Sequence, residues 1–105
     1  MGNPGEFELL VLLAVLRLRG EAYGVTLREE LERETSRTFS LGAVYKTLGR
    51  LEGKGYLRTR MAPPTGERGG RRKRLYQLAP AGLAAVRRSL SDLRRLTDGL
   101  ELETP

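Results

Sequence analysis

Residues 7–18 form an apolar run in which positions 9–16 carry no polar side chain. Acids in its first turn and arginines at its end complement a helix dipole, and Gly20 is well placed to end the helix. We therefore predict a helix over residues 6–19. A helix that is apolar on every side is typical of a buried core, but a small domain cannot surround such a helix with its own chain alone. We favour burial by a second copy of the protein over burial within one core.

The next segment mixes apolar and charged positions at helical spacing. Tyr23, Leu27 and Leu31 lie at i, i+4 and i+8, which predicts a helix over about residues 23–35. The charged positions between them are most simply a solvated helix face, and we assign no site to them.

A third helix is predicted over residues 41–54, because Ser40 is a good N-cap residue and Gly55 a good stop. Lys46 lies opposite its apolar stripe, and Tyr45 and Thr47 lie on the two flanks. The stripe follows spacings of three, four and three residues: Leu41, Val44, Leu48 and Leu51.

The half of this helix around Lys46 is small and cationic. It contains three glycines, each of which costs roughly 1 kcal/mol relative to alanine in a helix. Since these glycines lie off the apolar stripe, a physical reason to keep them is close approach to another surface; the alternative is an indifferent surface of small residues. The ring of Tyr45 can pack at the edge of the core while its hydroxyl faces a phosphate. The residues on this half are Gly42, Ala43, Gly49, Arg50 and Gly53.

A strand pair and a last helix follow. Residues 56–62 alternate with period two, and residues 71–78 predict a returning strand. The Pro- and Gly-rich residues 63–70 between them predict a mobile hairpin tip. The last helix is predicted over about residues 80–100, with a seam at alternating spacings of three and four residues.

That seam is suited to an intrachain core or to a dimer coiled coil. Because the first helix needs a partner, we favour a homodimer formed by these two helices. The predicted dimer interface is Phe7, Leu10, Val11, Ala14, Leu83, Val86, Leu90, Leu93, Thr97 and Leu100.

The order of elements predicts a fold that is mainly α with a small β-hairpin. We expect a winged helix-turn-helix domain over residues 1–78 and a C-terminal dimerisation helix over residues 79–105, within one compact domain overall.

Composition narrows the function. The 105 residues include no Cys and no His, which removes thiolate chemistry, the commonest general base and the commonest zinc ligands. We expect no enzyme activity, no cofactor and no metal site. The apolar run at residues 7–18 is too short to span a membrane and follows acids rather than the basic residues of a signal peptide, so we interpret the protein as cytoplasmic.

Charge is concentrated in the middle of the chain. Residues 36–78 hold eleven Lys and Arg against two acids, a local net charge of +9 in a chain whose total is +6. Such a field indicates a polyanion partner. In a winged helix-turn-helix the third helix enters the major groove and the wing reaches phosphates or the minor groove, so we expect Lys46 to read bases in double-stranded DNA. The predicted DNA contacts are Ser40, Gly42, Tyr45, Lys46, Thr47, Arg50, Arg68, Arg71, Arg72 and Lys73.

Two other classes of protein share these features. An RNA-binding winged helix would use the same basic face, although RNA recognition usually displays stacking aromatic residues. A protein-interaction winged helix would present its wing to an acidic partner.

Four segments in this order resemble the PadR family of bacterial transcriptional regulators. Residues 21–25 (EAYGV) look like the start of the family's second helix, and residues 40–48 (SLGAVYKTL) look like its recognition helix. Residues 51–57 (LEGKGYL) are similar to its helix-to-strand junction. Residues 74–82 (RLYQLAPAG) resemble its second wing strand and the start of its last helix.

The resemblance implies a dimeric repressor that binds a palindromic operator through Ser40, Tyr45 and Lys46. A single terminal helix looks like the family's short subfamily, in which small hydrophobic effectors bind at the dimer interface. Two departures stand out. Ala79 replaces the usual Thr or Ser helix cap, a change worth about 1 kcal/mol, and the chain has no Trp with which to stack a planar ligand.

Overall fold

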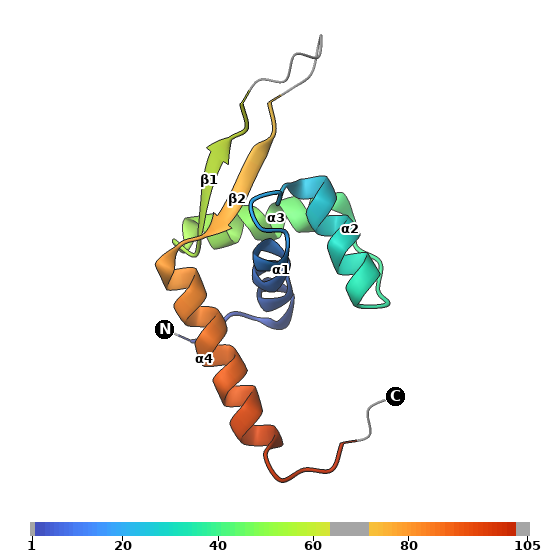
Figure 1. The fold of residues 1–105 in the computed structure, drawn as a ribbon, viewed down its shortest axis with the longest axis vertical. Helices are drawn as coiled ribbons and strands as arrows, with labels where there is room; N and C mark the ends of the chain where they lie inside the picture. Colours follow the sequence, from blue (N-terminus) through green and yellow to red (C-terminus); the bar gives the residue numbers. More distant parts are fainter. Residues whose placement is uncertain (1, 64–71, 103–105) are drawn as a thin grey trace.

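A computed structural model describes residues 2–63 and 72–102 and shows four helices and a two-stranded antiparallel hairpin within them (Figure 1). The mainly helical winged helix-turn-helix prediction is therefore confirmed. Most of the predicted hairpin tip, with Arg68 and Arg71, lies outside the described residues. The elements are α1 (Glu6–Arg17), α2 (Gly24–Glu34), α3 (Leu41–Gly53), β1 (Leu57–Met61), β2 (Arg74–Leu78) and α4 (Pro80–Thr97).

The helix α1 lies at the centre of the molecule, in contact with α2, α3, α4 and β2 (Figure 1). It ends two residues earlier than predicted, because Arg19 and Gly20 take left-handed φ angles of +46° and +91° that turn the chain. One of its faces is buried by the protein's own elements, whereas other residues of the helix stay partly exposed, so burial of the rest by a second copy remains a prediction. The buried residues of that face are Val11, Leu12, Ala14 and Val15.

The helices α2 and α3 form the helix-turn-helix. The hydroxyl of Ser40 accepts a hydrogen bond of 3.0 Å from the amide of Ala43, and Gly55 follows the helix with φ of +78°. Both predicted ends of α3 are therefore confirmed within one residue. The apolar side chains of the two helices meet in the core: Leu27, Leu31, Val44, Leu48 and Leu51 are buried.

The hairpin is shorter than predicted, and its register pairs Leu57 with Leu78 and Met61 with Arg74. The amide of Tyr76 donates a hydrogen bond of 2.8 Å to the carbonyl of Ala22, which ties β2 to the segment before α2. Leu75 and Tyr76 are both buried although they are adjacent, so β2 is covered on both faces rather than on one.

The helix α4 begins against the start of the hairpin. Ala79 has no side-chain cap, and its amide instead donates to the carbonyl of Tyr56 at 3.0 Å. Gly82 is required at this crossing, because a β-carbon there would lie 2.1 Å from the Tyr56 carbonyl oxygen. Near Thr97 the helix ends, and Gly99 adopts φ of +79°, so the predicted helix to residue 100 is too long.

The distal half of α4 extends away from the core, at the end of the molecule opposite the hairpin (Figure 1). Leu93 is 51% exposed and Leu96 is 75% exposed within a single chain. Among the helices in the described part of the chain, none has the length and apolar character needed to cross a membrane.

Candidate nucleic-acid interface

The outer face of α3 is smooth and cationic. A β-carbon on Gly42, Gly49 or Gly53 would meet no other atom within 4 Å. Lys46 and Arg50 are exposed, whereas the opposite side carries Val44, Leu48 and Leu51, which lie in the core. The three glycines therefore serve no packing contact inside the protein, and the cations project from a face with few side chains around them.

Tyr45 is held at the edge of this face. Its ring lies against Gly24, the first residue of α2, where a β-carbon would come within 2.4 Å of the ring. The side chain nevertheless remains at the surface, with the residue 49% exposed. The packing role of the ring and the surface role of the hydroxyl are therefore compatible in one side chain.

Thr47 is only 4% exposed, which corrects its placement among the predicted DNA contacts. It lies three residues after Val44 and four before Leu51, and this spacing puts it on the buried stripe rather than on its flank. The stripe of α3 is therefore one residue wider than its leucines and valine indicate.

Two predicted wing residues lie beside the hairpin. The Nε of Arg72 donates a hydrogen bond of 3.0 Å to the carbonyl of Ala62. The Nζ of Lys73 lies 4.5 Å from the ring centre of Tyr23 and 3.2 Å from its hydroxyl. Both cations are exposed, so these contacts orient them without removing them from solvent.

Arg74 is a cation of this surface that the sequence prediction omitted from its DNA contacts. Its guanidinium nitrogen Nη1 lies 3.9 Å from Oε1 of Glu52 in α3, and the hydroxyl of Thr59 lies 3.4 Å from Oε2 of the same carboxylate. The hairpin register puts Thr59 and Arg74 on one face, toward α3. Period-two alternation counted back from Tyr76 would have identified Arg74 in the sequence.

Tyr76 lies next to this ion pair. Burial raises the pKa of its hydroxyl, and the nearby carboxylate of Glu52 adds to the rise, although the charge of Arg74 opposes it. The hydroxyl is therefore neutral at physiological pH and can take part in hydrogen bonds as a donor.

The charged face of α2 differs in part from the solvated face that was predicted. Glu30 is buried and pairs with Arg17 of α1 at 2.5 Å and with Arg33 of its own helix. The hydrogen bond from Arg17 lowers the pKa of Glu30, although burial opposes this. Glu30 therefore ties α1 to α2 through Arg17. Within the described ranges, no three Asp or Glu side chains are grouped closely enough to hold a metal ion.

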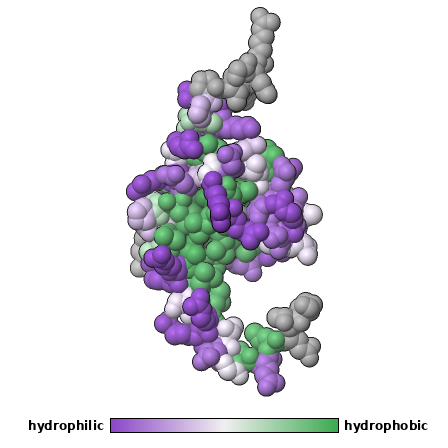
Figure 2. Space-filling view, viewed as in Figure 1, coloured by the Kyte–Doolittle hydropathy of each residue, from purple (hydrophilic) through white to green (hydrophobic). Residues whose placement is uncertain are grey.

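The predicted dimer residues divide into two groups. Val11, Ala14 and Val86 are at most 3% exposed in one chain, so they belong to its core and are corrected as interface residues. Figure 2 shows an apolar area over α1 and the adjoining part of α4. The remaining predicted interface residues are not part of the buried core of one chain. They are half-buried or exposed: Phe7, Leu10, Leu83, Leu90, Leu93, Thr97 and Leu100.

Comparison with known proteins finds transcriptional regulators both among protein families and among individual relatives. Residues 12–88 match the model of the transcriptional regulator PadR-like family. The chain is 40% identical over 78 residues to the transcriptional regulator Rv3488 of Mycobacterium tuberculosis, a match that covers 71% of this chain and 68% of that protein.

Solved structures share the fold. The crystal structure of a PadR family regulator from Clostridium difficile matches with a TM-score of 0.72 at 20% identity, covering 89% of this chain and 92% of that one. A PadR family regulator from Eggerthella lenta matches with a TM-score of 0.67 at 26% identity, covering 90% of this chain and 82% of the other. From the family match over residues 12–88 and these relatives, the chain belongs to the PadR-like family of transcriptional regulators.

Proposed function

We propose that this protein is a homodimeric repressor that binds a palindromic operator in double-stranded DNA through α3 and the β1–β2 hairpin. The observation that carries the proposal is the outer face of α3, on which Lys46 and Arg50 project beside glycines that contact nothing in the protein. A helix with so few side chains on one face can approach the floor of a groove closely. The winged helix-turn-helix fold provides the rest of the docking geometry.

Each part of the surface has a role in this proposal. Lys46 donates to guanine edges in the major groove, which is the commonest kind of specific contact. Ser40, Tyr45 and Arg50 contact phosphates and fix the register of α3 on the duplex. The wing cations Arg72 and Lys73 contact flanking phosphates, as would Arg68 and Arg71, which lie outside the described residues.

A second copy is the partner proposed for the apolar face formed by α1 and α4. The leucines of distal α4 contribute little to the fold of one chain, and burying an exposed leucine side chain stabilises an interface by about 1.5–3 kcal/mol. A two-fold dimer places the two copies of α3 on half-sites about 34 Å apart, or a multiple of that distance. Operator occupancy by such a dimer blocks transcription.

Release by a small hydrophobic effector is part of the proposal. A pocket of about 400 Å³ between the start of α1 and the middle of α4 is lined mainly by apolar atoms, including those of Leu9 and Leu93. The buried hydroxyl of Ser89 lines this pocket and has no hydrogen-bond partner among the described residues. The carboxylates of Glu6 and Asp92 also line the pocket, so a largely apolar molecule that carries hydrogen-bond donors fits this lining. The protein would act in the cytoplasm and without catalysis.

Selection of duplexes from a random-sequence DNA pool tests the proposal. The purified protein should enrich one palindromic sequence, and binding to the selected duplex should fall about 10³–10⁵-fold between 50 and 200 mM salt. Equal binding to RNA of the same sequence would favour the RNA-binding alternative. If the protein binds neither nucleic acid, the protein-interaction alternative is favoured instead.

A further inference from the structure

The first turn of α1 contacts the chain at both ends of α3. At the far end, the carboxylate of Glu8 accepts hydrogen bonds of 3.0 Å at each oxygen from the Nζ of Lys54, the C-cap residue of α3. The same carboxylate accepts from the amide of Gly5 at 3.2 Å, which closes the start of α1. The side chain of Glu8 is 10% exposed and that of Lys54 is 42% exposed, so the carboxylate end of this ion pair is shielded while its ammonium end meets solvent.

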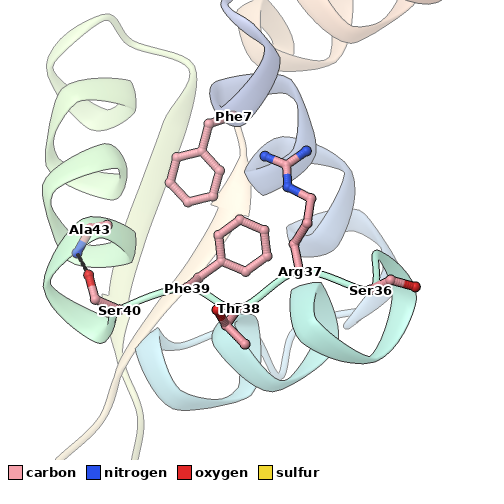
Figure 3. Close-up of a pocket in the computed structure, with 7 residues that line it drawn as sticks. All are labelled: Phe7, Ser36, Arg37, Thr38, Phe39, Ser40 and Ala43. Atoms are coloured by element: carbon pink, nitrogen blue, oxygen red, sulfur yellow. Dashed lines mark hydrogen bonds between the residues drawn. The ribbon is translucent and has the colours of Figure 1, made fainter.

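At the near end, Phe7 stacks on Phe39, the residue before the N-cap of α3, with ring centres 5.1 Å apart and planes within 13° of each other (Figure 3). The guanidinium of Arg37 also lies over the Phe39 ring, 5.4 Å from the ring centre, and pairs with Glu6 at 3.0 Å. Figure 3 shows the rings of Phe7 from α1 and Phe39 from the α2–α3 loop next to each other, with Ser40 following Phe39 along the chain.

These contacts restrict movement of α3 along its own axis, which its core leucines restrict less. An apolar stripe fixes which side of a helix faces inward, but it resists sliding along the helix axis less than directional contacts do. An aromatic stack at one end and a bidentate ion pair at the other fix the helix along its axis. Both originate from consecutive residues of α1, so they move together with that helix.

We propose that the first turn of α1 positions α3 for DNA recognition, with Glu8 as a positioning residue that acts through Lys54. The inference rests on the proposed function, because it assumes that α3 enters a DNA groove. For removal of the Glu8 charge, this inference predicts a change in affinity for the selected DNA opposite in sign to the change that electrostatics alone predicts. Removing an acid beside Arg50 and Lys54 should tighten binding to any polyanion, whereas loss of the anchor should weaken binding to one particular sequence.

The test uses a double-mutant cycle measured by fluorescence anisotropy on the duplex that the wild-type protein selects and on a scrambled duplex. Glu8→Lys should weaken binding to the selected duplex about tenfold, without weakening binding to the scrambled one. In the Lys54→Glu background the same change should strengthen binding to the selected duplex, because it restores an ion pair of reversed polarity. Glu29→Lys, the same charge change on an exposed position of α2, is the matched control.

The inference is overturned if Glu8→Lys tightens both duplexes as Glu29→Lys does, or if its effect has the same sign in both Lys54 backgrounds. Circular dichroism checks the fold of each variant. Should Glu8→Lys fail to fold, Glu8→Gln takes its place, and an unchanged ratio of selected to scrambled binding then overturns the inference. Failure of the proposed function itself would show earlier, since the wild-type protein would select no duplex.

Discussion

The ring of Tyr45 in α3 lies against the backbone of Gly24 at the start of α2, so close that a β-carbon on Gly24 would lie 2.4 Å from its Cζ and hydroxyl oxygen. This contact joins the two helices of the helix-turn-helix at the edge of the proposed DNA surface. Gly24 therefore determines where the Tyr45 hydroxyl is presented, although Gly24 itself is buried and carries no side chain.

Gly24→Ala should weaken DNA binding without unfolding the protein. The added methyl group collides with the end of a half-exposed side chain, which can swing away, so we expect a loss of stability below about 1 kcal/mol. Because we propose that the Tyr45 hydroxyl contacts a phosphate, displacing it should lower affinity for the selected duplex to the level of Tyr45→Phe. Anisotropy and thermal unfolding measure the two effects. Unchanged affinity would show that the position of the Tyr45 ring is unimportant for binding.

Gly49→Ala should have opposite effects on stability and on binding. Since nothing surrounds a β-carbon at this position, alanine should stabilise the free protein by about 1 kcal/mol through its helix propensity. In the complex the methyl group would separate α3 from the floor of the groove and reduce affinity. Urea denaturation measures the stability of the variant, and fluorescence anisotropy measures its affinity for the selected duplex. A variant that is more stable than the wild type and binds the duplex equally tightly would contradict the close approach of α3 to the groove floor.

The α-helical half of the fold was predictable because its signals are local. The Ser40 cap, the Gly55 stop and the leucine spacing of α3 each depend on neighbours within a few residues, and each prediction is confirmed. Burial of α1 depended instead on contacts with four other elements. No periodicity within an all-apolar run distinguishes a face covered by its own chain from a face left for a partner.

Leu90→Ser combined with Leu93→Ser should separate the proposed dimer. Both side chains are at the surface of one chain, so the protomer should lose little stability, while each dimer loses four leucine contacts. We expect the dissociation constant to rise at least about a hundredfold, measured by sedimentation velocity. Val25→Ser changes an equally exposed apolar residue on α2 and should leave association unchanged. A wild-type protein that is monomeric at micromolar concentration would contradict the dimer.

The Glu8–Lys54 pair predicts how stability depends on pH. Burial alone would raise the pKa of Glu8, but the hydrogen bonds from Lys54 and Gly5 and the charge of Arg50 lower it overall. A carboxyl whose pKa is lower in the folded than in the unfolded state stabilises the fold above its unfolded pKa, about 4.3. That contribution is lost as pH falls through the lower folded value.

Glu8→Gln should therefore be less stable than the wild type at pH 7, by about 1–3 kcal/mol, and the difference should shrink as pH falls below about 4. Urea denaturation at a series of pH values measures it, with the exposed Glu29→Gln as control. A difference between Glu8→Gln and the wild type that stays constant with pH would show that the charge of Glu8 is irrelevant to the fold.

The candidate site was predictable where helical geometry alone decides exposure. Lys46 and Arg50 lie on the outer face as their angle from the leucine stripe indicates. Thr47 was misplaced because only the leucines and the valine defined the predicted stripe, although its spacing from Val44 and Leu51 puts it on the same buried side. Alternation along the strand identifies Arg74, but its link to Glu52 depends on how the hairpin packs against α3, which the sequence pattern does not specify.

The most direct measurement of the central claim compares Lys46→Ala with the wild type on the selected duplex and on its scrambled version at one salt concentration. If α3 reads bases through Lys46, affinity for the selected duplex should fall by about 1–3 kcal/mol, while affinity for the scrambled duplex should change far less. An equal loss of affinity for both duplexes would show that Lys46 contacts phosphates rather than bases. No loss on either would contradict the placement of α3 in the groove.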